Sequence, residues 1–396
     1  MNYSDFFKMI PEASLVAILI VLFVADFATA KAEERKWFNP LASILLILNT
    51  FVCLYPMDTQ HLFGDMYVTS SAVNVMKAIL SMGTFIVVVQ SRTWAAKTGK
   101  EAEFYMLIVS TLLGMFAMMS AGNFVMFFLG LEMASVPLAC AVAFDMYRKN
   151  SAEAAAKFIL TATFSSGVML YGISFLYGQF GTLYFEDIAV KMQATPLTVI
   201  GLVFFFSGLG FKISLVPFHF WTADTYQGAP TTVTGYLSVI SKGAAAFTLL
   251  SILFHVFGGM MEYWHVLLMI VVVLSITIAN LFAVRQNELK RFMAFSSISQ
   301  AGYIMLAAIG NNWANSVAAL SYYILIYVVA NMAVFTIISV VEQNNGGKTD
   351  ISDYNGFYQT NPRLSFLMTL AMFSLGGIPP FAGMFSKFFI FMSGVN

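Results

Sequence analysis

Long uninterrupted apolar runs, separated by short polar segments, dominate this chain of 396 residues. A helix that crosses the hydrocarbon core of a bilayer needs about 20 mostly apolar residues. Lipid permits only helices and closed barrels, and the runs are continuous where barrel strands would alternate, so they predict helices. Twelve membrane spans are predicted, with approximate limits 14–30, 41–57, 71–90, 104–121, 123–143, 152–177, 197–219, 231–256, 265–285, 295–310, 317–341 and 364–391.

The composition agrees with this pattern and excludes a soluble protein. Hydrophobic residues make up 59% of the chain and charged residues only 10%, where soluble domains have about 25% charged residues. The formal net charge is zero, and no basic patch predicts binding to a nucleic acid. Cys53 and Cys140 lie in apolar runs without metal-ligand spacing and are interpreted as small apolar side chains. The expected fold class is an all-α polytopic membrane protein.

Basic residues outside the spans fall almost entirely on one side. The odd-numbered loops carry thirteen of them, and the opposite side carries only Lys8 and Lys191. The first loop contributes Lys31, Arg35 and Lys36. The positive-inside rule places the odd-numbered loops in the cytoplasm and the N-terminus on the outer side.

Five lysines interrupt the apolar spans, and they are the most informative residues of the chain. A lysine near the bilayer centre costs roughly 2.5–3.5 kcal/mol, so ionisable residues inside spans are functional candidates. Burial makes an amine release its proton more readily, and a nearby carboxylate makes it hold the proton. The pattern therefore indicates a carrier of protons or small cations. The five residues are Lys77, Lys157, Lys212, Lys242 and Lys387.

Their expected environments differ. Lys77 lies near one end of its span, where it either snorkels to the interface or has a function. Lys157 follows Glu153 by four residues, so the two share a helix face and can pair. Lys212 has no acid on its own helix. Glu132, near the middle of the fifth span, also needs a partner on another helix, and Lys212 is the expected one.

Prolines predict that two spans are broken. Pro217 lies between Lys212 and His219, and Pro379-Pro380 precede Lys387 among several glycines. Proline breaks a helix, and a broken helix at membrane depth is tolerated only where it lines protein or a water cavity. His219 is placed on the same helix face as Lys212, about 10 Å further along, as a proton relay or as an interface residue. Two broken helices that each carry a lysine are typical of transporters.

Four stretches around these residues resemble a known family. They are residues 130–132 (GLE), 211–230 (FKISLVPFHFWTADTYQGAP) followed by Ser241-Lys242, 290–298 (KRFMAFSSI), and 376–387 (GGIPPFAGMFSK). From about residue 100 to its end, the chain resembles the antiporter-like, proton-translocating subunits of respiratory complex I. Among these it is most similar to the subunit N type of bacterial NADH-quinone oxidoreductase.

The resemblance implies two inverted five-helix repeats with discontinuous helices 7 and 12. The expected segments are an N-terminal three-helix segment (1–100), a first repeat (101–256) and a second repeat (257–396). Members of the family have fourteen helices, so the second repeat is expected to be incomplete here. The resemblance implies that Glu132 and Lys212 are the acid–base pair of the first half-channel. It implies that Lys242 is the connecting lysine and Lys387 the distal lysine. Lys157 and His219 are implied as two further members of the same polar axis.

The implied function is that of a proton-translocating membrane-arm subunit, part of a translocase without redox chemistry of its own. NADH oxidation and quinone reduction would occur on other subunits, which would hold FMN and the iron–sulfur clusters. No cofactor or metal is expected on this chain, because it has no cysteine cluster and no glycine-rich turn between a strand and a helix. The expected partners are neighbouring antiporter-like and small membrane subunits and the lipid bilayer, in a bacterial inner membrane.

One alternative stays open from the sequence. The same features fit a sodium/proton antiporter, or a homologous subunit of a multi-subunit antiporter or membrane hydrogenase. A purely structural membrane scaffold is disfavoured, because it would not carry the cost of five buried lysines.

Overall fold

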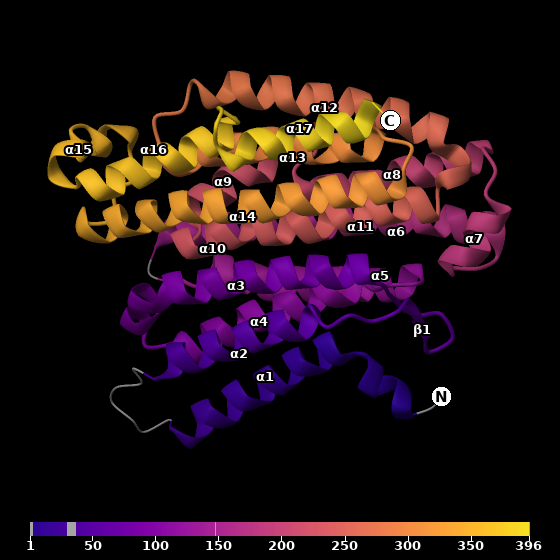
Figure 1. The fold of residues 1–396 in the computed structure, drawn as a ribbon, viewed down its shortest axis with the longest axis horizontal. Coiled ribbons are helices and arrows are strands. Elements are labelled where there is room, and N and C mark those ends of the chain that lie inside the picture. The colour runs from indigo at the N-terminus through magenta and orange to yellow at the C-terminus, as the bar shows by residue number, and fades with distance from the viewer. Residues whose placement is uncertain (1–2, 30–36, 147, 396) are drawn as a thin grey trace.

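The computed structural model describes residues 3–29, 37–146 and 148–395, and in these ranges the chain forms a bundle of roughly parallel helices (Figure 1). One end of the bundle, here called the hairpin end, carries the strands β1 (Gln60–Leu62) and β2 (Tyr67–Thr69) and the short helix α7 (Phe185–Lys191). The opposite, basic-loop end carries Lys100 and Arg148 in its loops and Arg92, Lys97 and Lys149 in the adjoining helix ends, and α15 marks it in Figure 1. The predicted basic residues Lys31, Arg35 and Lys36 lie outside the described residues.

The helices follow one another up and down between these two ends. The first half contains α1 (Ile10–Ala28), α2 (Phe38–Cys53), α3 (Ser71–Thr98), α4 (Glu101–Met119), α5 (Phe124–Val142), α6 (Lys149–Phe180), α8 (Pro196–Ile213), α9 (Phe220–Gly228), α10 (Thr231–Tyr236) and α11 (Lys242–His255). The second half contains α12 (Met261–Ala283), α13 (Leu289–Leu306), α14 (Trp313–Asn344), α15 (Phe357–Thr360), α16 (Pro362–Gly376) and α17 (Ala382–Val395). A π-helical turn, Leu237–Ser241, joins α10 to α11, and 3₁₀ turns cover Tyr3–Lys8, Gly258–Met260, Ala307–Ile309 and Ile351–Tyr354.

Each predicted span coincides with helix, and the fold class is confirmed. Ten of the described helices are long and apolar enough to cross a membrane. The second predicted span is a shorter helix that ends at Cys53, because the chain leaves it for the β hairpin. The seventh and twelfth spans are each split into two helices, as the prolines predicted. The seventh therefore stops at Ile213, six residues before its predicted limit.

Local sequence signals fix several helix ends. The Ser70 and Asn123 side chains accept backbone N–H groups at the starts of α3 and α5. Such caps satisfy backbone donors that the helix leaves unpaired. Thr195 and Thr198 cap α8 reciprocally, and Pro196 occupies its first position, where a proline costs no hydrogen bond.

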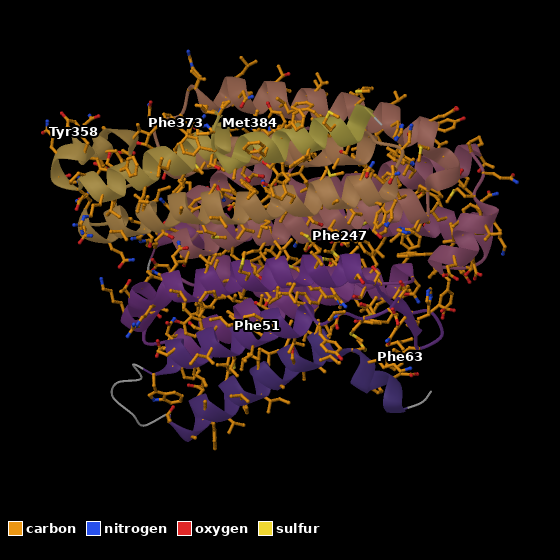
Figure 2. All side chains as sticks on the ribbon, in the orientation of Figure 1. Phe51, Phe63, Phe247, Tyr358, Phe373 and Met384 are labelled. Atoms are coloured by element: carbon orange, nitrogen blue, oxygen red, sulfur yellow. The ribbon has the colours of Figure 1, made fainter. Side chains whose placement is uncertain are left out.

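The helix formed by α10, the π turn and α11 lies at the centre of the bundle. Of the 18 consecutive residues that form its most apolar stretch, 89% are buried inside the protein. Phe247 on α11 is fully buried, whereas Phe51 on α2 is 67% exposed (Figure 2). Outward-facing apolar residues on α2 and α12 match a lipid-facing surface, since lipid chains replace water there. The central helix is therefore the element whose polar residues most need partners inside the protein.

Lys77 does not snorkel to the interface, and that interpretation is wrong. Its side chain is fully buried, and its Nζ lies 2.6 Å from Oε1 of Glu12 on α1 and 3.2 Å from the hydroxyl of Tyr67 on β2. The Tyr67 hydroxyl in turn donates to Glu12 Oε2 at 2.9 Å. Removing one partner of a buried ion pair strands the other charge. The cluster therefore fastens α1 and the β hairpin to α3.

We expect Lys77→Met to destabilise the protein by about 3–5 kcal/mol, because it leaves the Glu12 carboxylate buried without its counter-ion. The double variant Glu12→Gln/Lys77→Met removes both charges and keeps an amide oxygen for the Tyr67 hydroxyl, so it should recover most of that loss. The measurement is the fraction of protein that stays monodisperse in detergent after heating. Equal losses in the single and double variants would contradict the assignment of a buried ion pair.

Candidate functional site

The first helix break separates Lys212 from His219. The residue that ends α8, Ser214, has a left-handed backbone with φ 68°, a conformation that costs a non-glycine residue about 1–3 kcal/mol. The indole of Trp221 on α9 donates to the carbonyl of Phe211 at 3.0 Å, which satisfies part of the exposed end of α8. Because the helix ends at Ile213, His219 does not continue the helix face of Lys212, and that expectation is wrong.

The second break, between α16 and α17, has the same plan with a different donor. α16 ends at Gly377 in the left-handed region, with φ 78°, which glycine adopts without strain. Here the carbonyls of Leu375 and Gly376 accept hydrogen bonds from Lys387 Nζ, each at 3.0 Å. Lys387 therefore occupies at the second break the capping position that Trp221 occupies at the first.

Lys212 is buried, with 5% exposure, at the end of α8. Its Nζ donates to the hydroxyl of Ser135 on α5 at 2.7 Å. Glu132 lies on the same helix, one turn before Ser135, and its Oε1 is buried without a hydrogen-bond partner. The expected direct pairing of Glu132 with Lys212 is therefore absent from this structure, and Ser135 takes the place of the carboxylate.

Lys242 begins α11 directly after the π-helical turn and is 1% exposed. π turns inside helices occur mainly at functional sites. Its Nζ donates to the hydroxyl of Ser297 on α13 at 2.7 Å and lies 5.4 Å from the ring centre of Tyr226. The Tyr226 hydroxyl also contacts the Ser297 hydroxyl, at 3.3 Å. The Ser297 hydroxyl therefore connects Lys242 to Tyr226 on α9.

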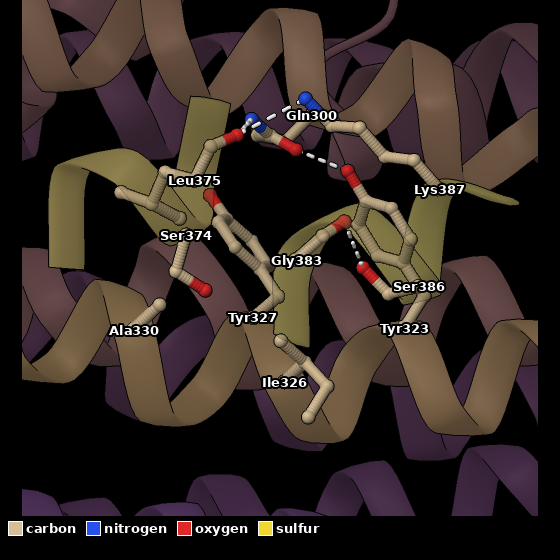
Figure 3. A pocket seen from close by; sticks show the side chains of 10 residues that line it. All are labelled: Gln300, Tyr323, Ile326, Tyr327, Ala330, Ser374, Leu375, Gly383, Ser386 and Lys387. Carbon is tan, nitrogen blue, oxygen red and sulfur yellow. Dashed lines mark hydrogen bonds between the residues drawn. The ribbon is translucent and has the colours of Figure 1, made fainter. Parts of the chain in front are cut away.

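A small cavity links α13 to Lys387 (Figure 3). Gln300 lies one turn after Ser297, and its Nε2 donates to the carbonyl of Leu375 at 3.0 Å, the same carbonyl that Lys387 contacts. The hydroxyl of Tyr323 on α14 donates to Gln300 Oε1. The cavity has about 10 Å³ for the centres of water molecules, which is close to the least volume that holds one water. Polar groups therefore continue from Lys242 through α13 to Lys387.

Several buried polar atoms near the first helix break have no protein partner among the described residues. Thr222 and Thr225 on α9 are fully buried, and their hydroxyls have no hydrogen-bond partner among the described residues. The same holds for Nδ1 of His219, which is 9% exposed. Buried polar groups in native proteins are almost always satisfied by protein or by water. These three side chains therefore indicate ordered water beside the first helix break.

Lys157 lies at the basic-loop end and is half exposed. The predicted pair with Glu153 forms, at 2.7 Å, and Lys157 Nζ also contacts Asp224 Oδ2 on α9 at 2.7 Å. The other oxygen of Asp224 accepts from Arg291 on α13 at 2.7 Å. This network joins α6, α9 and α13 at the surface of the bundle.

Four lysines of the predicted spans lie within the bundle, Lys387 partly buried and the other three buried, and they fall into two kinds. Lys77 has a carboxylate at ion-pair distance. Among the described residues, no carboxylate oxygen lies within 4.0 Å of the Nζ of Lys212, Lys242 or Lys387, which contact hydroxyl or carbonyl oxygens. A charged amine in such a place is costly unless it is hydrogen-bonded and close to water. None of the three therefore has a carboxylate at ion-pair distance, and Glu132 acts on Lys212 only from further away.

Sequence reasoning missed the partners of these lysines. Ser135, Ser297 and Gln300 are neutral residues inside predicted spans. Lys290 is one of the thirteen basic residues that the sequence assigns to the odd-numbered loops, but it is 2% exposed and donates to the carbonyl of Ala229. The available signal was the spacing of polar residues on one helix. Lys290, Ser297 and Gln300 follow one another at intervals of seven and three, which places them on one face.

Comparison with known proteins gives a consistent result. Residues 121–396 match the model of the family described as NADH:quinone oxidoreductase/Mrp antiporter, transmembrane. The chain is 58% identical to NADH-quinone oxidoreductase subunit N of Phocaeicola vulgatus over all of this chain and 84% of that protein. It is 49% identical to the subunit N of Azobacteroides pseudotrichonymphae over all of this chain and 83% of that one.

A solved structure has the same fold. A chain of respiratory complex I from Thermus thermophilus with bound aureothin has a TM-score of 0.81 and 28% identity, over 97% of this chain and 82% of that one. The family model covers more than half of the chain, and the two relatives cover all of it. The chain therefore belongs to the family of NADH:quinone oxidoreductase/Mrp antiporter transmembrane proteins.

Proposed function

We propose that this chain is subunit N of an NADH-quinone oxidoreductase and moves protons across the membrane. It is part of an oxidoreductase complex, in which the translocase activity arises from several subunits together. NADH, FMN, the iron–sulfur clusters and quinone are bound by other subunits. Its partners are the other membrane-arm subunits of the complex and the lipid bilayer.

The observation that carries this proposal is the row of Lys212, Lys242 and Lys387. Each amine contacts neutral oxygen atoms, and neutral side chains on α13 connect the second to the third. Lys77, with the carboxylate of Glu12 beside it, is by contrast part of a tight ion pair. A buried amine without a carboxylate beside it releases its proton at lower cost than an amine in a tight ion pair, which holds the proton.

In the first half-channel, Glu132 on α5 acts on Lys212 at the end of α8. In the present state Ser135 holds the Lys212 amine, and Glu132 Oε1 has no hydrogen-bond partner. Pro137 lies inside α5 and removes a backbone hydrogen bond there, which makes this helix easier to bend. Movement of Glu132 toward Lys212 stabilises the proton on the amine, and movement away releases it toward His219 and Lys242 through water.

From Lys242 the proton passes along α13. As the Ser297 hydroxyl accepts the proton from the Lys242 amine, it releases its own proton to water, and the cavity at Gln300 and Tyr323 leads to Lys387. Lys157 contributes from the edge, through Asp224, by fixing α9 relative to α6. The roles of all these residues are part of the proposal.

The location and internal organisation follow from the same reasoning. The protein lies in a bacterial inner membrane with the basic-loop end in the cytoplasm and the N-terminus outside. The segment 1–100 packs as a unit of three spans, and 101–256 and 257–396 form two repeats of inverted orientation. The repeats are supported by the sequence of long helices followed by one broken helix, α8–α9 in the first and α16–α17 in the second.

A self-standing antiporter is the alternative, and the family description includes antiporters. Purification separates the two functions. We expect this chain to co-purify with NADH:quinone reductase activity and with other membrane-arm subunits.

Lys212→Ala should leave assembly largely intact and lower proton pumping at least tenfold, because it removes the amine that Glu132 acts on. Proton pumping is measured in reconstituted vesicles with NADH and quinone. Lys191→Ala is the matched control, since Lys191 is an exposed lysine on α7 at the hairpin end. Normal pumping by an assembled complex with Lys212→Ala would disprove the proposed path.

Ser297→Ala should lower proton pumping roughly ten- to a hundredfold, because a hydrogen bond to a charged group contributes about 1.5–3 kcal/mol. Ser297→Thr keeps the hydroxyl and should retain most of the rate. Ser296→Ala is the control for a serine loss on the same turn of α13. If Ser297→Ala pumps protons at the same rate as Ser296→Ala, the proposed role of Ser297 in accepting a proton from Lys242 is wrong.

A further inference from the structure

A groove between α3 and α14 lies at the basic-loop end, and the proposed proton path does not use it. α3 follows β2 directly, and Trp313 at the start of α14 lines a cavity with the β hairpin, so both helices run from the hairpin end to the basic-loop end. The groove has about 240 Å³ for the centres of water molecules. The residues that matter here are Gln90, Thr93 and Lys97 of α3 and Ser339, Val340 and Gln343 of α14.

The charge of this groove is positive and has no partner. Lys97 is the one charged residue that lines it, and its amine makes no hydrogen bond or ion pair within the described part of the chain. A neighbouring cavity that Lys97 also lines contains two acids, but Arg148 holds both, Asp145 at 3.2 Å and Glu342 at 2.9 Å. The groove therefore favours a negatively charged ligand.

Buried polar atoms around Lys97 also lack partners. Gln90 lines the groove, and neither Nε2 nor Oε1 of its side chain has a hydrogen-bond partner among the described residues, although both atoms are buried. The hydroxyl of Thr232, in the neighbouring cavity, is in the same situation, and this residue is 1% exposed. Native proteins almost always satisfy such groups, so water or a bound molecule must supply the missing partners.

The order of groups along the groove identifies the class of ligand. Lys97 is one residue from the end of α3, and Gln90 lies two turns before it, about 10 Å further into the membrane. Beyond Gln90 the outward side chains are apolar, with Val89 47% exposed and Val329 of α14 54% exposed. Charge, amide and apolar surface follow one another as phosphate, ester carbonyls and acyl chains do in a phospholipid. Water or a free phosphate ion would match only the polar part.

We propose that this groove binds one acidic phospholipid of the leaflet at the basic-loop end. The Lys97 ammonium donates to a phosphate oxygen, a charge-assisted hydrogen bond, and the Gln90 amide donates to an ester carbonyl. The acyl chains lie along Val89 and Val329. Because no carboxylate lines the groove, an acidic headgroup fits it better than one that carries an ammonium group. The inference needs the membrane location of the chain and not the proposed proton path.

The bound lipid joins two parts of the chain that are far apart in sequence. In the groove itself, the Thr93 hydroxyl donates to Gln343 Oε1 at 3.1 Å, and Gln343 Nε2 donates to the Ser339 hydroxyl at 3.1 Å. These contacts leave the Lys97 amine and the Gln90 amide unused. A lipid that engages both groups fills the space between α3 and α14 and holds the N-terminal helices against the second half of the bundle.

The first test adds a phosphatidylglycerol with a diazirine near the start of one acyl chain to the delipidated, assembled complex. After illumination, mass spectrometry should find the lipid on peptides of this chain that contain Val89 or Val340. Lys97→Gln should lower the yield about tenfold at low lipid concentration, the loss expected for one hydrogen bond to a charged group. Arg92→Gln is the matched control, since Arg92 is an exposed basic residue of α3 that lines neither cavity. Equal yields in the two variants would overturn the inference.

Competition in the wild-type complex identifies the source of the phosphate. Unlabelled phosphatidylglycerol should suppress the adduct, whereas inorganic phosphate and an uncharged diacylglycerol, each in large excess, should not. Suppression by inorganic phosphate would indicate a site for a free anion, and suppression by diacylglycerol would indicate an unselective lipid-facing surface. Either result would overturn the proposal. So would the absence of any adduct in the groove, which is the result expected if a neighbouring subunit covers it.

A second test examines Gln90 and uses heat resistance. Adding phosphatidylglycerol to the delipidated complex should raise the temperature at which this chain aggregates. Gln90→Leu removes the amide that contacts the ester carbonyl, so the lipid should raise that temperature less in this variant than in the wild type. Gln90→Asn keeps an amide and should retain part of the effect. An unchanged lipid effect in Gln90→Leu would contradict the assigned contact.

Discussion

The structure depends on how an ammonium group is held inside a membrane without a carboxylate beside it. Lys212, Lys242 and Lys387 contact a serine hydroxyl, another serine hydroxyl and two backbone carbonyls. Each contact needs a polar atom at membrane depth, and the fold supplies it in a different way. The helices α5 and α13 present side chains, and the broken end of α16 presents carbonyls that a continuous helix would have used internally.

The helix breaks and the π turn are therefore parts of one arrangement. A left-handed residue ends α8 and α16, and the π turn lies directly before Lys242. Each irregularity exposes backbone groups that lipid cannot satisfy. The π turn and Ser214 at the first break are buried inside the bundle, whereas Ile378 and Pro379 at the second break are exposed in this structure. The ion pair of Lys77 with Glu12 shows the contrasting solution, in which two charges neutralise each other and join helices.

The spans, both breaks and the lysines themselves could be predicted from the sequence, because apolar length, proline and buried charge are local signals. The hydrogen-bond and ion-pair partners of these lysines could not be predicted. Lys212 contacts Ser135 where the carboxylate of Glu132 was expected, and the choice between two residues one turn apart on α5 depends on tertiary geometry. Burial of Lys77 and Lys290 was missed for the same reason, since Glu12 and the Ala229 carbonyl come from distant parts of the chain. Neutral residues such as Ser297 carry no charge signal, and only their spacing on α13 distinguishes them.

The central claim is that water connects these amines. It is tested most directly by a cryo-EM map of the assembled complex at a resolution that shows ordered water. The account predicts waters beside Thr222, Thr225 and His219 that join Lys212 to Lys242 in steps of about 3 Å. A dry, tightly packed interior between these two lysines, or a Lys242 amine in contact with lipid, would contradict it.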